Sequence, residues 1–134
     1  MSVGILLVTH NAIGEQLLGT AKATLGFCPV QTSCLAVAQD VDPDSMEKEA
    51  LGLLQQLDTG EGVLVLTDAY GSTPSNVASR LAQRERICVI AGVNLPMLLR
   101  VFNYPRLSLQ ELANKAVTGG QDGVVLVQAS QHAS

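Results

Sequence analysis

The feature that most constrains this chain is an apolar run, Val3 to Val8, that ends abruptly in Thr9 and His10. A run of that length, rich in branched side chains, is typical of a strand buried on both faces, as in a parallel sheet. A second run, Val63 to Thr67, ends in the same way at Asp68. Ligands and catalytic groups collect at the carboxyl edge of such sheets, because the loops vary there while the strands hold them rigidly. The sequence therefore places His10 and Asp68 at one edge of a sheet.

The composition is that of one globular domain with a substantial core. Of 134 residues, 47% are hydrophobic and 15% are charged, which excludes a disordered chain. Aromatic residues make up only 3%, and the formal net charge of -4 argues against a nucleic-acid-binding face. The first residues lack the basic region of a signal peptide, and no run approaches the roughly 20 apolar residues of a membrane helix. We therefore expect a soluble, cytoplasmic protein.

The three cysteines give no sign of a metal site. Cys28, Cys34 and Cys88 are odd in number and show no CxxC spacing, and no histidine lies near them in the sequence. We interpret them as reduced thiols, and we expect neither a bound metal nor a cofactor.

Helices and strands are predicted to alternate along the chain. Beyond the two apolar runs, the periodicity predicts strands over residues 33–37, 86–91 and 124–127, and helices over residues 14–25, 43–57, 74–83, 95–102 and 109–118. This alternation favours an α/β fold with a single domain and a mainly parallel sheet flanked by helices. In a flavodoxin-like strand order the first and third strands are neighbours. His10 and Asp68 would then come within hydrogen-bonding reach.

A histidine beside an aspartate has a clear chemical use. The carboxylate of Asp68 would fix the tautomer of His10 by accepting a proton from one ring nitrogen, leaving the other free as a nucleophile or base. The polar loop after Asp68 runs directly into a helix, with Thr73 before Pro74 as the expected cap. The N-terminus of that helix is suited to an anion, because its backbone N–H groups lack partners. The three features together suit a phosphoryl group.

Other interpretations of the same residues stay open. In a purely structural one, His10 only terminates its strand and Asp68 is a turn residue. A Ser-His-Asp hydrolase is less well supported, since neither Ser72 nor Ser75 lies in a GxSxG elbow. The chain has no GxxxxGK[ST] motif, so a P-loop nucleotide enzyme is not supported. We interpret the second histidine, His132, as a solvated residue.

Three segments in chain order resemble the enzyme IIA domain of the mannose family of the phosphoenolpyruvate-dependent sugar phosphotransferase system (PTS). They are Ile5 to His10, Leu66 to Arg80, and Ile90 to Leu98. The resemblance extends over nearly the whole chain, and it implies a IIA domain over residues 1–128 followed by a frayed tail over residues 129–134.

The family resemblance implies a phosphocarrier that acts as a protein-histidine phosphotransferase component. His10 matches the histidine that accepts a phosphoryl group from the histidine-containing phosphocarrier protein and passes it to an enzyme IIB in sugar uptake. Asp68 matches the aspartate that orients this histidine. The membrane would be involved only indirectly, through the permease complex. The residues that we expect to contact the phosphoryl group are Thr9, Gly71, Ser72 and Thr73.

The resemblance also implies a homodimer with an exchanged strand. Family members form dimers in which the carboxyl-terminal strand crosses to the sheet of the partner. In this chain the matching segment is Val124 to Val127, and we expect Gly119-Gly120 to act as its hinge.

The loop after Asp68 departs from the family pattern at two positions. A family loop Asp-Thr-Trp-Gly-Gly-Ser-Pro is here Asp68 to Pro74, with Ala69 in place of the threonine and Ser72 in place of a glycine. The hydroxyl at position 69 is therefore missing, and we expect Ser72 and Thr73 to compensate in binding the phosphoryl group.

Partners and alternatives follow from the same resemblance. We expect the donor to dock over an apolar rim formed by Tyr70 and Leu95 to Met97, although the run Leu95 to Leu99 also fits a core helix. The sequence contains no IIB domain or linker, so we expect the acceptor to be a separate protein or to be missing. If it is missing, the phosphorylated state could itself be the signal. Two further functions stay open: a regulatory sensor of phosphorylation state without a transport role, and the phosphocarrier subunit of dihydroxyacetone kinase. The segment Gly92 to Pro96 is more similar to the mannose family than to that subunit.

Overall fold

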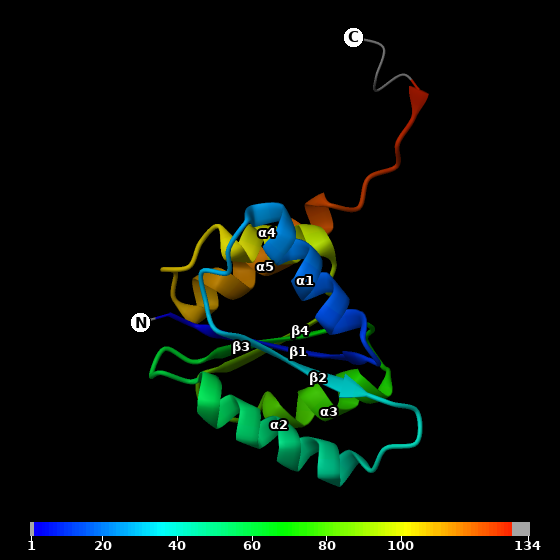
Figure 1. The fold of residues 1–134 in the computed structure, drawn as a ribbon, viewed down its shortest axis with the longest axis vertical. Coiled ribbons are helices and arrows are strands. Elements are labelled where there is room, and N and C mark those ends of the chain that lie inside the picture. Colours follow the sequence, from blue (N-terminus) through cyan, green and yellow to red (C-terminus); the bar gives the residue numbers. More distant parts are fainter. Residues whose placement is uncertain (1, 130–134) are drawn as a thin grey trace.

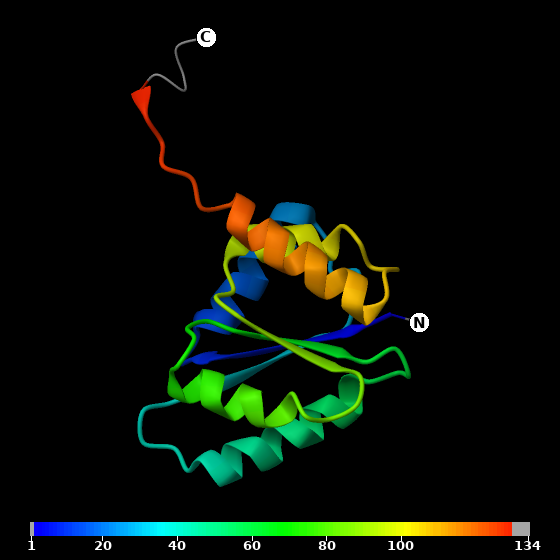
Figure 2. The ribbon, with the colours of Figure 1, turned by 180° about the vertical axis from the view of Figure 1, so that it is seen from behind.

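A four-stranded sheet lies between two layers of helices in the computed structural model, which describes residues 2–129 (Figure 1). The strands are β1 (Gly4–His10), β2 (Thr32–Val37), β3 (Val63–Thr67) and β4 (Ile87–Ala91). Helices α1 (Ile13–Leu25), α4 (Leu95–Phe102) and α5 (Leu109–Asp122) cover one face, and α2 (Pro43–Leu57) and α3 (Thr73–Leu81) cover the other (Figures 1 and 2). All strand pairs are parallel, in the order β2-β1-β3-β4. The predicted α/β fold, with the first and third strands as neighbours, is confirmed.

The two central strands explain the unbroken apolar runs of the sequence. Successive side chains of a strand point to opposite faces, and both faces of β1 are covered by helices. Ile5 and Leu7 pack beneath α1, α4 and α5, whereas Leu6 and Val8 pack against α2 and α3. All four are fully buried, and burial of each such side chain contributes roughly 1.5–3 kcal/mol. The sheet is therefore a rigid base for the loops at its carboxyl edge.

Two helices, α2 and α5, start at the capping signals of the sequence. The side chain of Asp42 accepts the backbone N–H of Asp44 and caps α2, with Pro43 in the first turn. Ser108 and Glu111 form the predicted capping box of α5, and their hydrogen bonds lower the pKa of the Glu111 carboxyl. Within residues 2–129, none of the helices has the length and apolar character needed to cross a membrane.

The predicted hinge at Gly119 and Gly120 is wrong, because both glycines lie inside α5, which continues to Asp122. Their lack of side chains lets α5 approach α4 closely. A Cβ on Gly119 would lie 2.6 Å from the Cβ of Arg100, and one on Gly120 would lie 2.9 Å from the Cε of Met97. The glycine pair is a contact between helices, and it overrides the usual tendency of glycine to end a helix.

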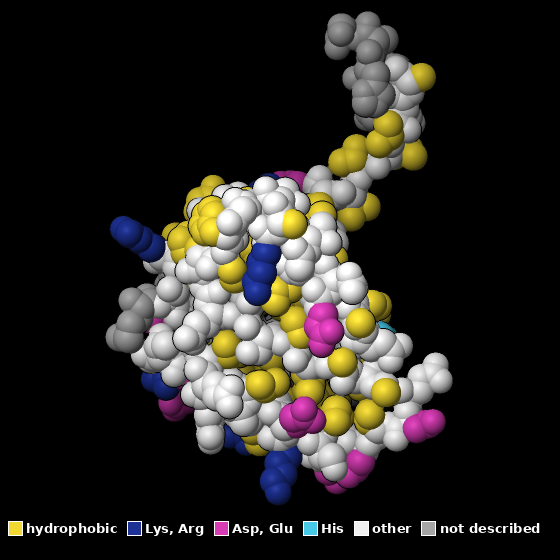
Figure 3. Space-filling model, viewed as in Figure 1, with side chains coloured by type: hydrophobic (Ala, Val, Ile, Leu, Met, Phe, Trp, Pro, Cys, Tyr) yellow, Lys and Arg dark blue, Asp and Glu magenta, His cyan; other side chains and the backbone are white. Residues whose placement is uncertain are grey.

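The last described residues form an extended arm, Val124 to Val127, that leaves the body after α5 (Figures 1 and 2). Its four apolar side chains are 60% to 78% exposed, and Figure 3 shows them in yellow, projecting away from the domain. The arm does not pair with the sheet of its own chain, so the edge strand expected there is absent from this sheet. Most of the predicted frayed tail, residues 130–134, lies outside the described residues.

We expect Gly119→Ala to lower the free energy of unfolding by roughly 1–3 kcal/mol, because the Cβ of Arg100 cannot move without its helix backbone. Gly52→Ala is the matched control. Gly52 is an exposed glycine within α2, and a Cβ added there would meet nothing within 4 Å. This change should therefore raise the free energy of unfolding by roughly 0.5–1 kcal/mol. Urea denaturation of both variants measures the difference. Equal stabilities would rule out close packing of the two helices at Gly119.

Candidate active site at the carboxyl edge of the sheet

The structure brings His10 and Asp68 together at the carboxyl ends of neighbouring strands. His10 ends β1 and Asp68 follows β3, and the two strands pair in register, with Val8 opposite Thr67. The Nδ1 of His10 lies 2.8 Å from the Oδ2 of Asp68, and the backbone N–H of His10 donates to the same oxygen at 3.1 Å. One carboxylate oxygen therefore holds both the main chain and the ring of His10.

This contact selects one tautomer of the neutral imidazole. A carboxylate oxygen accepts hydrogen bonds and donates none, so in the neutral ring Nδ1 carries the proton and Nε2 has the free lone pair. The Asp68 side chain is only 10% exposed, whereas that of His10 is 41% exposed. The aspartate supports the ring from within the protein, and the ring remains accessible to a reactant.

Ser72, rather than the predicted Thr73, is the cap of α3. Its Oγ accepts the backbone N–H of Ser75 at 3.4 Å and donates to the carbonyl oxygen of Ala69 at 2.5 Å. Ser72 has the extended backbone of a cap, while Thr73 is already helical. Gly71 has a φ of +82°, a left-handed conformation that glycine adopts without strain, and so completes the turn from Ala69 to Ser72.

The turn before α3 presents unused hydrogen-bond donors. Within residues 2–129 no acceptor is found for the backbone N–H groups of Tyr70, Gly71 and Thr73. They lie at or next to the N-terminus of α3, where the helix dipole adds a partial positive charge. Thr73 is exposed, and its hydroxyl forms no hydrogen bond in the described part of the chain. The hydroxyl proton of Ser72, in contrast, is used within the turn.

Thr9 occupies a different position from the one expected for a phosphoryl ligand. It is 1% exposed, and its Oγ1 accepts the backbone N–H of Gly14 in α1.

Asn11, on the other side of His10, has a φ of +46°. Residues other than glycine adopt this left-handed conformation only uncommonly. Asn11 was not among the expected site residues; the signal for it was that asparagine tolerates the left-handed region better than most residues.

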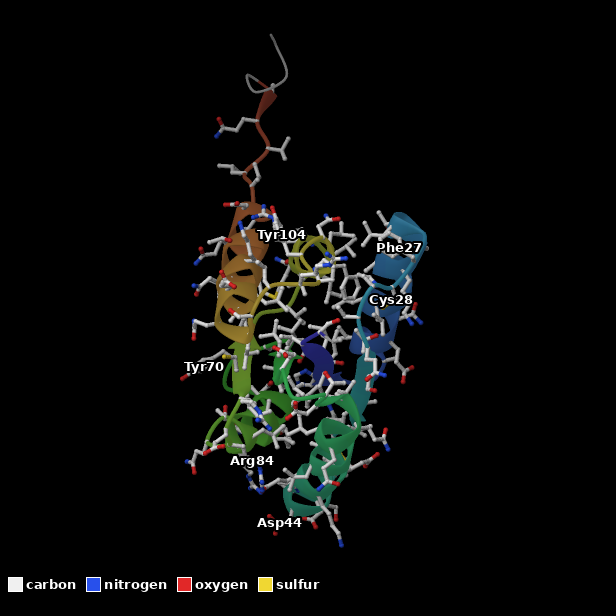
Figure 4. All side chains as sticks on the ribbon, turned by 90° about the vertical axis from the view of Figure 1, so that its left-hand side faces the viewer. Phe27, Cys28, Asp44, Tyr70, Arg84 and Tyr104 are labelled. Atoms are coloured by element: carbon white, nitrogen blue, oxygen red, sulfur yellow. The ribbon has the colours of Figure 1, made fainter. Side chains whose placement is uncertain are left out.

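An apolar groove lies between α1 and α4, and the first residue of its lining, Ala12, follows His10 by two positions in the chain. It is lined by Ala12, Ile13, Gln16, Leu17, Thr20 and Leu95. Of the residues expected at the docking rim, Tyr70 is 89% exposed and points away from the domain (Figure 4), whereas Met97 is buried in the core. Phe27, at the far end of α1, is exposed outside this groove (Figure 4).

The three cysteines lie away from the site. Cys28, Cys34 and Cys88 are half-buried against the core beneath α1, α4 and α5. Burial raises the pKa of the Cys34 thiol, and the nearby Glu15 raises it further; burial likewise raises the pKa of Cys88. The raised pKa keeps the Cys34 and Cys88 thiols protonated at neutral pH and makes them poor nucleophiles. No cluster of three potential metal-ligating residues occurs in residues 2–129.

Comparison with known proteins gives consistent matches. The family described as PTS system fructose IIA component matches residues 4–117. The chain is 35% identical over 132 residues to the mannose-specific EIIAB component of the phosphotransferase system of Escherichia coli K12. This match covers 96% of the chain but only 41% of the relative, so the chain spans less than half the length of that protein.

Two solved structures with the same fold are described as proteins of the phosphotransferase system. The mannose/sorbose specific IIA subunit from Enterococcus faecalis superimposes with a TM-score of 0.84 at 22% identity, over 96% of both chains. The PTS IIA protein associated with the fucose utilization operon of Streptococcus pneumoniae superimposes with a TM-score of 0.76 at 25% identity, over 100% of both chains.

We expect Ser72→Ala to lower the free energy of unfolding by about 1 kcal/mol, because α3 loses its cap. Thr73→Ala is the control and should change stability by less than about 0.5 kcal/mol, since Thr73 is exposed and makes no side-chain hydrogen bond within residues 2–129. Chemical denaturation of both variants distinguishes the two residues. A larger loss for the Thr73 variant would assign the cap to Thr73.

Proposed function

The chain belongs to the family of PTS system fructose IIA components, and on this basis we propose that it is a cytoplasmic phosphocarrier in sugar uptake. His10 takes a phosphoryl group from the histidine-containing phosphocarrier protein and passes it to an enzyme IIB. The observation that carries this proposal is the pair formed by His10 and Asp68, which leaves an accessible imidazole with a fixed tautomer.

The proposed reaction is an exchange between two imidazole rings. Nε2 of His10 attacks the phosphorus as the N–P bond of the donor phosphohistidine breaks, and the donor ring leaves with that electron pair. Nδ1 of His10 keeps its proton throughout. Positive charge develops on the ring as Nε2 gives up its lone pair, and the carboxylate of Asp68 at 2.8 Å stabilises it. Positioning and electrostatic stabilisation are the main means by which proteins catalyse phosphoryl transfer.

The phosphoryl oxygens are bound by the turn before α3. The free backbone N–H groups of Gly71 and Thr73 and the free hydroxyl of Thr73 support this assignment. The partial positive charge at a helix N-terminus stabilises a bound anion by roughly 0.3–1 kcal/mol. Ser72 contributes by holding the turn, since its own hydroxyl already donates to Ala69.

The donor protein docks over the apolar groove between α1 and α4. Transfer requires the donor to cover His10, and the groove runs along the helix that follows this residue, from Ile13 and Leu17 to Leu95. Tyr70 stands exposed on the loop beside the site and gives the donor a second contact.

Two copies of the chain form a dimer by exchanging their arms. The arm exposes four neighbouring apolar side chains, and soluble proteins rarely leave such an apolar patch uncovered. β4 is an edge strand whose outer side has no partner strand within residues 2–129, and unpaired edges accept further strands. A pocket of about 250 Å³ beside β4, lined in part by Ala91, Met97 and Val117, is open to side chains of the partner's arm.

We expect the intact chain, incubated with phosphoenolpyruvate, enzyme I and the phosphocarrier protein, to gain one acid-labile phosphate. His10→Ala should gain none, and His132→Ala, the matched change at the other histidine, should be labelled normally. Asp68→Asn should fold but accept phosphate roughly tenfold more slowly or worse, because the ring loses its orientation. Mass spectrometry and single-turnover rates measure these effects. A labelled His10→Ala variant, or an unlabelled natural chain, would contradict the proposal.

The same assay tests the docking surface and the acceptor. Ile13→Ser should raise the donor concentration needed for half-maximal rate roughly fivefold or more, with an unchanged maximal rate, whereas Phe27→Ser should change neither. Equal values for the two variants would show that the donor does not dock over the groove.

Adding an enzyme IIB should discharge the phosphate from His10, and retention of the phosphate would instead support a regulatory sensor.

The exchanged arm predicts a dimer that weakens when the arm is charged. Leu126→Glu should raise the dimer dissociation constant roughly tenfold or more, because burying an unpaired carboxylate is unfavourable. Phe27→Ser, which alters an exposed apolar residue elsewhere, should leave the dimer intact. Analytical ultracentrifugation over a range of concentrations measures both. A monomeric natural chain, or an unaffected Leu126→Glu dimer, would contradict the exchange.

A further inference from the structure

Helix α1 starts without a cap from its own first residues. Ala12 occupies the cap position, and its methyl side chain cannot accept a hydrogen bond. A hydroxyl from the preceding strand takes over, since the Oγ1 of Thr9 accepts the backbone N–H of Gly14 at 2.8 Å. This hydrogen bond spans His10, so it closes the short loop that carries the proposed nucleophile.

The contact is tight on both sides. Thr9 is 1% exposed, and Gly14 is buried against it. A Cβ on Gly14 would lie 3.0 Å from the Oγ1 of Thr9 and 3.2 Å from the Cβ of Leu7. Position 14 therefore leaves little room for any side chain, and the start of α1 sits directly on the end of β1.

The loop that carries His10 is also held at Asn11. Asn11 has a left-handed backbone, with a φ of +46°, and its N–H donates to the carbonyl oxygen of Val37 in β2. His10 is thereby tied to three elements: to the end of β3 through Asp68, to β2 through Asn11, and to α1 through Thr9. Of the two side-chain contacts among these, the one from Thr9 is fully buried, whereas those of Asp68 are partly buried.

We infer that Thr9 is a positioning residue for phosphoryl transfer, and this inference rests on the proposed function of His10. Its hydroxyl oxygen holds the loop so that Nδ1 of His10 meets Asp68 and Nε2 points to the donor. Without it the loop relaxes, and the ring samples orientations in which Nδ1 leaves the carboxylate. Because in-line transfer depends on alignment, a small displacement slows it strongly.

Three variants of the intact chain test this assignment. Thr9→Val keeps the shape but removes the acceptor, Thr9→Ser restores the acceptor, and Gly14→Ala forces the helix start away from an intact hydroxyl. Nitrogen-15 NMR of the unphosphorylated ring should show the Nδ1–H tautomer in the natural chain and in Thr9→Ser. Thr9→Val and Gly14→Ala should show a mixture of both tautomers.

Transfer rates complete the test. At saturating donor, Thr9→Val and Gly14→Ala should be about tenfold slower, with little change in the half-saturating donor concentration, and Thr9→Ser should stay within about twofold of the natural chain. The inference is overturned if Thr9→Val is less stable but keeps the natural tautomer and rate. It is also overturned if Thr9→Ser is as slow as Thr9→Val, or if transfer slows without a tautomer change, which would mean direct contact with the phosphoryl group. Should the natural chain accept no phosphate, the proposed function fails, and the tautomer comparison still decides whether Thr9 orients the His10 ring. If Thr9→Val does not fold, Gly14→Ala tests the same contact.

Discussion

The parallel pairing of β1 with β3 is the interaction on which the rest of the structure depends. Both strands are buried on both faces, and their register puts His10 beside Asp68 at the carboxyl edge. A slip of one residue would turn the side chains of a strand to the opposite faces and would also separate this pair. The packing of the two cores and the geometry of the site are therefore specified by one register.

Rigidity at the site comes from behind the imidazole. A ring that exchanges a phosphoryl group with other proteins, as proposed here, has to stay accessible, so its support has to be internal. Asp68 supplies this support to the ring, and two hydroxyl groups close the adjacent helix starts: Thr9 for α1 and Ser72 for α3. Each hydroxyl accepts one N–H of its helix. At α3, the N–H groups of Gly71 and Thr73 have no acceptor within residues 2–129, so this turn is both ordered and suited to an anion.

Predictions from the sequence failed where two neighbouring residues could serve the same local role, or where a contact with a residue distant in the chain determined the structure. Both Ser72 and Thr73 carry a capping hydroxyl, and only the backbone conformation separates the cap from the first helical residue. Gly119 and Gly120 look like a helix end, but α4 packs closely on them, and that packing outweighs their low helix propensity. Met97 lies in a run that fits both a rim and a core helix, and the rotation of α4 turns it inward.

The sequence by itself determined the alternation of strands and helices, the parallel sheet, and the two strand ends that carry His10 and Asp68, because these follow from local periodicity and from the burial of central strands. Only the tertiary structure decided that one carboxylate oxygen holds both the backbone and the ring of His10, that Thr9 faces Gly14 rather than solvent, and that the arm finds no place in its own sheet. Those outcomes depend on distances between side chains far apart in the chain, and periodicity carries no information about them.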